Sequence, residues 1–156
     1  MTRFLLAALI GLTAGQAQAL SCMPADIART FNWAAAAEER YIVLNGTFSF
    51  EAPPRTSQLE QETESYDAMF EGSYLGVDGF AIAPSLDVTL TFVCLGPWCG
   101  SIESGGDDIL VFAQQTTNGY LIEVDPCFGT IFPSDDENIE RVQSCMRGEA
   151  CEEKPF

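Results

Sequence analysis

The fold is decided by residues 107–127, which read DDILVFAQQTTNGYLIEVDPC. Two apolar runs rich in β-branched residues, 109–113 and 120–124, enclose the pair Asn118-Gly119. Asn-Gly is favoured in tight hairpin turns because both residues tolerate positive φ. The stretch therefore predicts a β-hairpin that ends on a cysteine.

Further strands are expected before this hairpin. Residues 86–93, LDVTLTFV, alternate apolar and polar side chains, as a half-buried strand does. Gly46 lies inside a long apolar run and indicates a bulge or a sharp bend. The segment 51–67 is polar, carries Pro53-Pro54 and shows no period, so an exposed loop is expected there. Strands are predicted at 41–50, 68–75, 79–83 and 86–93.

Two helices are expected to flank the strands. Residues 24–40 favour helix, with Ile27, Phe31 and Ala34 on one face. Residues 134–147 predict a C-terminal helix, because Ser134 and Glu137 match a capping box and a glycine follows at 148. The tail after this helix is expected to fray. The fold class is mainly β with two flanking helices, and several short strands with turns between them suggest a small closed barrel or a sandwich.

The first nineteen residues predict an export signal. Arg3 precedes an apolar run at 4–12, and 17–19 form a small-x-small cleavage site. The apolar run is shorter than the roughly 20 residues that span a bilayer. We therefore expect cleavage after Ala19, a periplasmic or secreted protein without a transmembrane segment, and a single domain over 20–156. The alternative is cleavage before Cys22 and a lipid anchor on that cysteine.

The composition restricts the function. The chain has 23 acidic and 7 basic residues, so it repels phosphate backbones and nucleic acid is not an expected partner. The absence of histidine removes Ser-His and Cys-His nucleophiles and the common zinc sites. The acidity favours solubility over calcium binding. No cofactor or metal is expected.

All six cysteines lie beyond the predicted signal, and an even number in an exported chain predicts three disulfides. Four residues, Leu-Gly-Pro-Trp, stand between Cys94 and Cys99, whereas only two stand between the cysteines of a typical redox pair. The spacing therefore favours a structural loop disulfide. Cys145 and Cys151 are close enough in sequence to join locally.

Short motifs along most of 22–145 resemble the OB-fold domains of tissue inhibitors of metalloproteinases and of netrin C-terminal modules. The resemblance implies that this chain is an exported bacterial member of that family. In those domains a Cys-x-Pro, a helix with an Ala-Phe and a strand come first, and a Cys-Gly, a glycine-rich turn and a hairpin ending on cysteine follow. The matching residues here are Cys22-Met23-Pro24, Thr30-Phe31, 41–48, Cys99-Gly100, Gly105-Gly106, 109–113, Asn118-Gly119, 120–124 and Cys127.

The resemblance implies a small five-stranded OB-like closed barrel that is fastened by a Cys22–Cys127 disulfide. Two disulfides of the family lack one of their cysteines in this chain, which leaves Cys99 and Cys145 without their family partners. Cys94 and Cys151 lie close to them in sequence, so the resemblance implies the pairs Cys94–Cys99 and Cys145–Cys151. The family's inhibitors coordinate the zinc ion of the protease through the free amine and carbonyl of an N-terminal cysteine, but the matching position here is Leu20. Metalloproteinase inhibition is therefore not implied.

Three functions are compatible with the sequence. The favoured one is an exported non-catalytic OB-fold module that binds an envelope or extracellular protein or glycan, with Trp98 as an anchor. Packing of Trp98 on the adjacent disulfide is the structural alternative. The second function is an envelope hydrolase with a carboxylate pair. The third is a thiol-disulfide protein that uses Cys94 and Cys99. The candidate carboxylates are Asp107-Asp108 and Asp125 with Glu123.

Overall fold

Five strands close on one another into a barrel. The computed structural model describes residues 21–51, 63–127 and 129–155. Within them the barrel runs β1, β2, β4, β7, β6 and back to β1, with β4 and β7 parallel and the other neighbours antiparallel. The predicted five-stranded OB-like barrel is therefore confirmed. Its strands are β1 Tyr41–Ser49, β2 Thr63–Gly76, β4 Leu86–Leu95, β6 Ile109–Thr116 and β7 Gly119–Val124.

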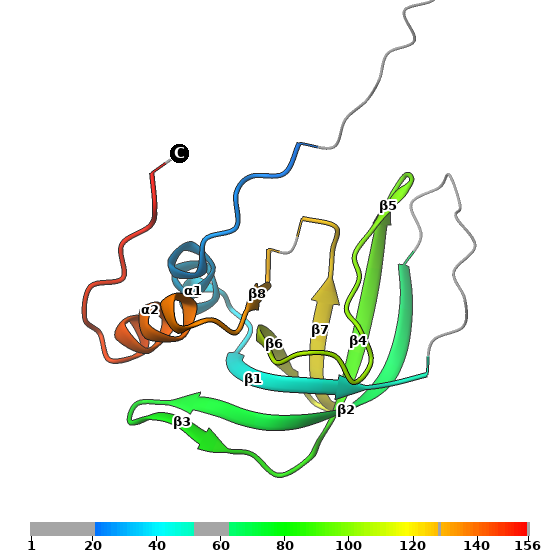
Figure 1. Cartoon of the computed structure of the whole chain (residues 1–156), viewed down its shortest axis with the longest axis horizontal. Coiled ribbons are helices and arrows are strands. Elements are labelled where there is room, and N and C mark those ends of the chain that lie inside the picture. The colour runs from blue at the N-terminus through cyan, green and yellow to red at the C-terminus, as the bar shows by residue number, and fades with distance from the viewer. Residues whose placement is uncertain (1–20, 52–62, 128, 156) are drawn as a thin grey trace, which may run out of the picture.

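Three short strands extend this barrel in the described part of the chain. β3 Gly79–Ile82 pairs with β2, β5 Trp98–Cys99 pairs with β4, and β8 Ile131–Pro133 pairs with β6. In Figure 1 the β4–β5 hairpin projects at one end of the barrel, and the β2–β3 hairpin projects at the other.

The barrel interior is filled by alternate side chains of every strand. In β4 the buried residues are Val88, Leu90 and Phe92, as the alternation predicts. The rings of Phe48 and Phe70 pack 5.2 Å apart between β1 and β2. Burial of such aromatic side chains dominates the energy of a small core.

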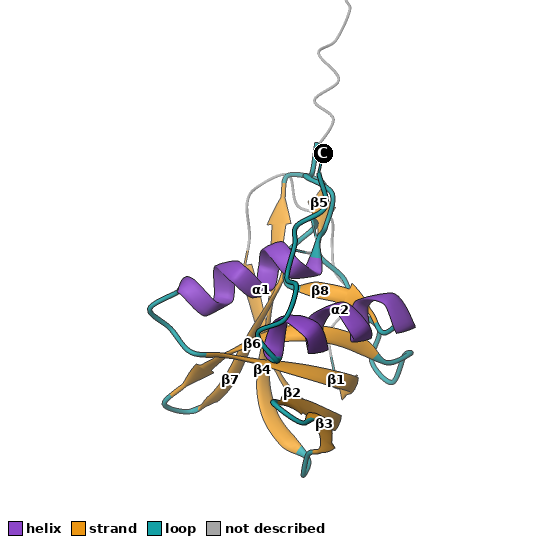
Figure 2. Ribbon diagram, turned by 90° about the vertical axis from the view of Figure 1, so that its left-hand side faces the viewer, coloured by secondary structure: helices purple, strands orange, loops and turns teal. Residues whose placement is uncertain are grey.

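A second apolar layer lies outside the barrel, under the helices α1 Ile27–Ala36 and α2 Asp136–Met146. Figure 2 shows both helices across one side of the barrel. Leu110 and Phe112 of β6 face this layer, while Val111 and Ala113 face the interior. Burial on both faces explains why β6 reads as a continuous apolar run instead of an alternating one.

Both helices begin later than predicted because aspartates set their starts, and α1 also ends at Ala36 instead of residue 40. Asp26 caps α1 by accepting a hydrogen bond from Arg29 N at 2.9 Å, so Pro24 lies outside the helix. Asp135, and not Ser134, caps α2 by accepting from Asn138 N at 2.8 Å. Gly148, with φ +72°, follows the end of α2 as expected.

The prediction of an exposed loop over 51–67 is wrong for residues 63–67, because these five residues form the start of β2. They pair with β4 from Thr63↔Val93 to Asp67↔Thr89. Their polar side chains face solvent, and Tyr66 alone packs inward on Phe92, with ring centroids 5.6 Å apart. One apolar side chain in five residues leaves no alternation to detect. Residues 52–62 lie outside the described ranges.

The structure also differs from the predicted hairpin turn and from the bulge or bend expected at Gly46. The hairpin loop consists of Thr117 and Asn118, because Gly119 already pairs with Thr116 and opens β7 with φ +128°. At Gly46 the β1–β2 pairing continues without a bulge, opposite Gly72. A Cβ atom on Gly46 would come within 2.2 Å of Glu71 O, so close strand approach explains this glycine.

Three disulfides join Cys22 to Cys127, Cys94 to Cys99 and Cys145 to Cys151, which are the pairs that the resemblance implies. The first bridge connects the segment before α1 to the end of β7 across 105 positions. A lipid anchor at Cys22 is incompatible with this bridge, because the sulfur that would carry the lipid is bonded to Cys127.

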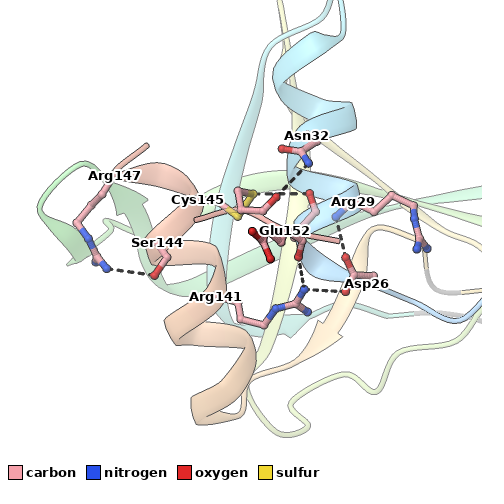
Figure 3. Close-up of a disulfide and its surroundings, with 10 residues drawn as sticks. Asp26, Arg29, Asn32, Arg141, Ser144, Cys145, Arg147 and Glu152 are labelled. Carbon is pink, nitrogen blue, oxygen red and sulfur yellow. Dashed lines mark hydrogen bonds and ion pairs between the residues drawn. A yellow bond between two sulfur atoms is a disulfide. The ribbon is translucent and has the colours of Figure 1, made fainter. Parts of the chain in front are cut away.

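The C-terminal tail is anchored, contrary to the expected fraying. Arg141 donates to Glu152 O at 3.0 Å, and Asn32 donates to Cys151 O at 3.4 Å. Arg29 forms an ion pair with Glu153 at 3.1 Å. Figure 3 shows the tail held against α1 and α2 beside the Cys145 disulfide. These cross-connections involve single polar groups far apart in sequence, so no local pattern predicts them.

Asp26 links the two helices beneath this tail. Its Oδ2 lies 2.8 Å from Arg141 Nη2, and the aspartate side chain is 3% exposed. Burial acts to raise the pKa of Asp26, but the hydrogen bond from Arg29 N and the pairing with Arg141 outweigh it and hold the pKa below its ordinary 3.8. The unfolded chain therefore takes up this proton first, and the stabilisation is lost as pH falls through the folded-state pKa.

Asp26→Asn is expected to keep the helix cap but to lower the free energy of unfolding at pH 7 by about 1–3 kcal/mol. The variant should also lose the part of the acid dependence below about pH 4 that this carboxylate supplies. Urea unfolding at several pH values measures both effects. Glu149→Gln is the control, since the Arg147–Glu149 pair is exposed and should contribute little. Equal acid dependence in wild type and Asp26→Asn would contradict the assignment.

Candidate binding site

The segment 100–108 connects β5 to β6 and is fixed to the end of β1. Ser104 Oγ donates to Phe50 O and accepts from Phe50 N, both at 2.9 Å. Gly105 N donates to Phe48 O at 2.8 Å. Gly105 has φ +67°, a conformation that glycine adopts without strain. These contacts hold the acidic residues on either side of the turn in place.

A cleft of about 600 Å³ lies between this segment and β8. We call it the acidic cleft. Its volume is in the range of small-ligand and peptide-anchor sites. The apolar part of its lining includes Ile131 and Phe132, which are 6% and 4% exposed, and the partly buried Ile102 and Ile109. Its lining is Ala25, Phe48, Ser101, Ile102, Glu103, Gly106, Asp107, Asp108, Ile109, Ile131, Phe132, Pro133, Ser134 and Asp135.

Four carboxylates surround this apolar lining. Glu103, Asp107 and Asp108 are exposed on the fixed segment. Asp135 faces them from the start of α2, where one of its oxygens already caps the helix. The cleft therefore offers an apolar contact next to three carboxylates that no helix cap uses.

The basic side chains lie elsewhere. Segment 41–133 contains 13 acidic residues and one basic residue, Arg55, which is outside the described ranges. In the part of the chain that the structure describes, the ion pairs lie among the two helices, the Asp26 cap and the tail after α2. None of these pairs involves Glu103, Asp107 or Asp108, so their negative charge faces solvent.

The structure separates the two predicted carboxylate pairs. Asp107 and Asp108 both line the acidic cleft. Glu123 instead lines a different hollow, and Asp125 accepts hydrogen bonds from Cys127 N at 2.7 Å and Gly129 N at 3.2 Å. Asp125 therefore shapes the turn after β7, and Glu123 and Asp125 do not share a site.

Trp98 lies on β5 at the tip of the β4–β5 hairpin and is 41% exposed. It pairs with Leu95 across the hairpin, next to the bridged pair Cys94 and Cys99. Trp98 does not line the acidic cleft. No helix begins at Cys94 or Cys99 in the described chain, so the feature that commonly lowers a thiol pKa in redox pairs is missing there.

The hollow that Glu123 lines was not foreseen. It measures about 440 Å³ and lies beside α1, where Met23 and Trp33 are 57% and 50% exposed. The Trp33 ring packs 4.9 Å from Tyr41. Its lining passes from Cys127 to Gly129, and residue 128 between them is outside the described ranges. We therefore assign no site there.

Sequence reasoning identified Asp107 and Asp108 but missed Glu103 and the apolar lining of the cleft. Glu103 reaches the cleft only because Ser104 and Gly105 bind the end of β1, more than fifty positions earlier. A pair of aspartates directly before an apolar strand, after a glycine-bearing turn, was the available signal.

In the described ranges no helix has the length and apolarity needed to span a membrane. Within the same ranges no three histidine, cysteine, aspartate or glutamate side chains are arranged so that they could hold a metal ion together. Neither a protein-family model, nor a curated protein, nor a solved structure matches this chain.

Proposed function

We propose that this chain is an exported, non-catalytic OB-like module that binds an envelope or extracellular protein through the acidic cleft. The observation that carries the proposal is the combination of an apolar lining with three carboxylates that neither an ion pair nor a helix cap occupies. Apolar contact supplies binding energy, while the charges favour particular partners and accelerate encounter.

Export is supported by the disulfides and by the signal-like residues 1–19, which lie outside the described ranges. Such bridges persist in oxidising compartments such as the periplasm or the extracellular space. The Cys22–Cys127 bridge also supports the proposed kinship with OB domains of the metalloproteinase-inhibitor and netrin type. Leu20 occupies the position of their zinc-gripping cysteine, so binding without metalloproteinase inhibition is proposed.

Site-specific photo-cross-linking tests the proposal. A photoreactive amino acid at position 107 is expected to capture a partner in the native host, and mass spectrometry of the adduct distinguishes a protein from a glycan. Position 87 is the matched control, because Asp87 is also an exposed aspartate but does not line the acidic cleft. No adduct at 107, or the same adducts from both positions, would contradict binding at the acidic cleft.

Trp98 remains a predicted second anchor. Because its side chain is already 41% exposed, Trp98→Ala is expected to lower the free energy of unfolding by no more than about 1 kcal/mol. The same change is expected to reduce the yield of the adduct captured at position 107. A larger loss of stability with an unchanged adduct would instead assign Trp98 to packing on the Cys94–Cys99 bridge.

A hydrolase that uses Asp107 and Asp108 is the alternative function, and it is favoured by the position of both carboxylates at one cleft. It requires turnover of a substrate that is lost in both Asp107→Asn and Asp108→Asn. The binding proposal requires instead that each variant weaken the complex only partly.

A further inference from the structure

We infer that the occupant of the acidic cleft is a cationic amphipathic peptide segment of another protein, with lysine or arginine next to bulky apolar side chains. This inference rests on the proposed binding function and specifies the partner. An apolar side chain would lie against the partly buried Ile102 and Ile109, and the neighbouring cations would meet Asp107, Asp108 and Glu103.

The apolar part of the argument is the lining. Ile102 and Ile109 are partly buried and pack against the interior cluster that contains Ile131, and they leave apolar surface open to the cleft. A side chain of leucine or phenylalanine size fits a cleft of about 600 Å³ and would remove this surface from water. A purely ionic ligand would leave the apolar surface uncovered.

The electrostatic part is charge complementarity. The barrel segment 41–133 has 13 acidic residues against one basic residue, and the described ion pairs lie among the helices and the tail. Negative potential gathered at a low-dielectric cleft raises the local concentration of cations and the association rate of a cationic partner.

The same charge argues against other occupants. Anionic lipid surfaces and nucleic acids are repelled by a chain of formal charge −16. A second copy of the chain carries the same excess, and four of the five basic residues in the described ranges, Arg29, Arg141, Arg147 and Lys154, are already held in ion pairs, which leaves Arg40 alone to meet the carboxylates. A peptide with unpaired cations satisfies both the charge and the apolar lining.

Titration with defined peptides tests this inference. Three capped hexapeptides of alternating Lys-Leu, Lys-Ser and Ser-Leu sequence separate charge from apolar contact. We expect the mature protein to bind the Lys-Leu peptide at least tenfold more tightly than either of the others, measured by calorimetry at low salt. Equal affinity for Lys-Leu and Lys-Ser would reduce the effect to non-specific charge attraction and overturn the inference.

Two double variants place the binding on the molecule. Asp107→Asn with Asp108→Asn is expected to weaken Lys-Leu binding between about 2-fold and 30-fold, as expected for two exposed ion pairs. Asp67→Asn with Asp87→Asn makes the same change in net charge outside the acidic cleft and is expected to leave affinity within 2-fold. Equal losses in both double variants, with circular dichroism unchanged, would contradict the inference.

The two proposals fail differently. If cross-linking at position 107 captures a protein whose bound segment lacks cations, the binding function stands and the cationic partner is wrong. If the Lys-Leu peptide binds but protects neither residue 107 nor residue 108 from exchange or labelling, the peptide binds elsewhere and the inference fails, whereas the binding function fails only if cross-linking at position 107 captures no specific partner.

Discussion

Replacing Cys22 and Cys127 together with serine is expected to lower the free energy of unfolding by about 5 kcal/mol. The bridge spans 105 positions, and in the chain-entropy model a loop of this length restricts the unfolded chain strongly. Total stabilities of 5–15 kcal/mol are typical of single domains, so the double variant should lose a large share or unfold. Urea unfolding with the wild type in parallel measures the difference.

The matched control is the pair Cys94→Ser and Cys99→Ser. Its bridge spans only 5 positions and is expected to contribute about 2 kcal/mol in the same model. Both double variants remove two cysteines and one bridge, so only loop length separates them. If the control lost as much stability as the variant at Cys22 and Cys127, the long bridge would not be the main constraint on this fold.

Gly100→Ala is expected to destabilise the protein by about 3 kcal/mol or more. An ideal Cβ atom at this position would lie 1.9 Å from Val124 O and 2.4 Å from Val124 C. The glycine is buried, and its N–H donates to Val93 O at 3.0 Å, so it joins the end of β4 to the end of β7. The backbone would have to move apart to admit a methyl group.

Gly76→Ala is the control for this change. A Cβ atom at Gly76 would meet nothing closer than 3.7 Å, and the residue lies in a strand, as alanine tolerates. Its free energy of unfolding is expected to stay within about 1 kcal/mol of wild type. Thermal unfolding of both variants gives the comparison. A Gly100→Ala protein as stable as Gly76→Ala would show that the two strand ends are not in close contact.

Much of the barrel was predictable because its strands bury side chains in regular patterns. The alternation in β4 gives its length, and the continuous apolar run of β6 reflects burial against both the interior and the helices. The order of closure was not available from these patterns, since pairing between β1 and β6 joins residues about seventy positions apart. The resemblance to OB domains supplied the closure.

The misses share one physical cause, which is that long-range polar contacts decide local structure. The start of β2 is a strand because β4 lies beside it, although its own residues are polar. The tail is ordered because Arg29, Arg141 and Asn32 bind its backbone and side chains. Half of the candidate site was visible as Asp107-Asp108, whereas Glu103 and β8 join it only in the folded chain.

The most direct test of binding at the acidic cleft is an NMR titration of the ¹⁵N-labelled chain from residue 20 onward with the Lys-Leu hexapeptide. We predict that the largest amide shifts fall in residues 101–110 and 131–135, the two segments that meet at the cleft. Shifts concentrated around Met23 and Trp33, or spread evenly over the barrel, would contradict the account.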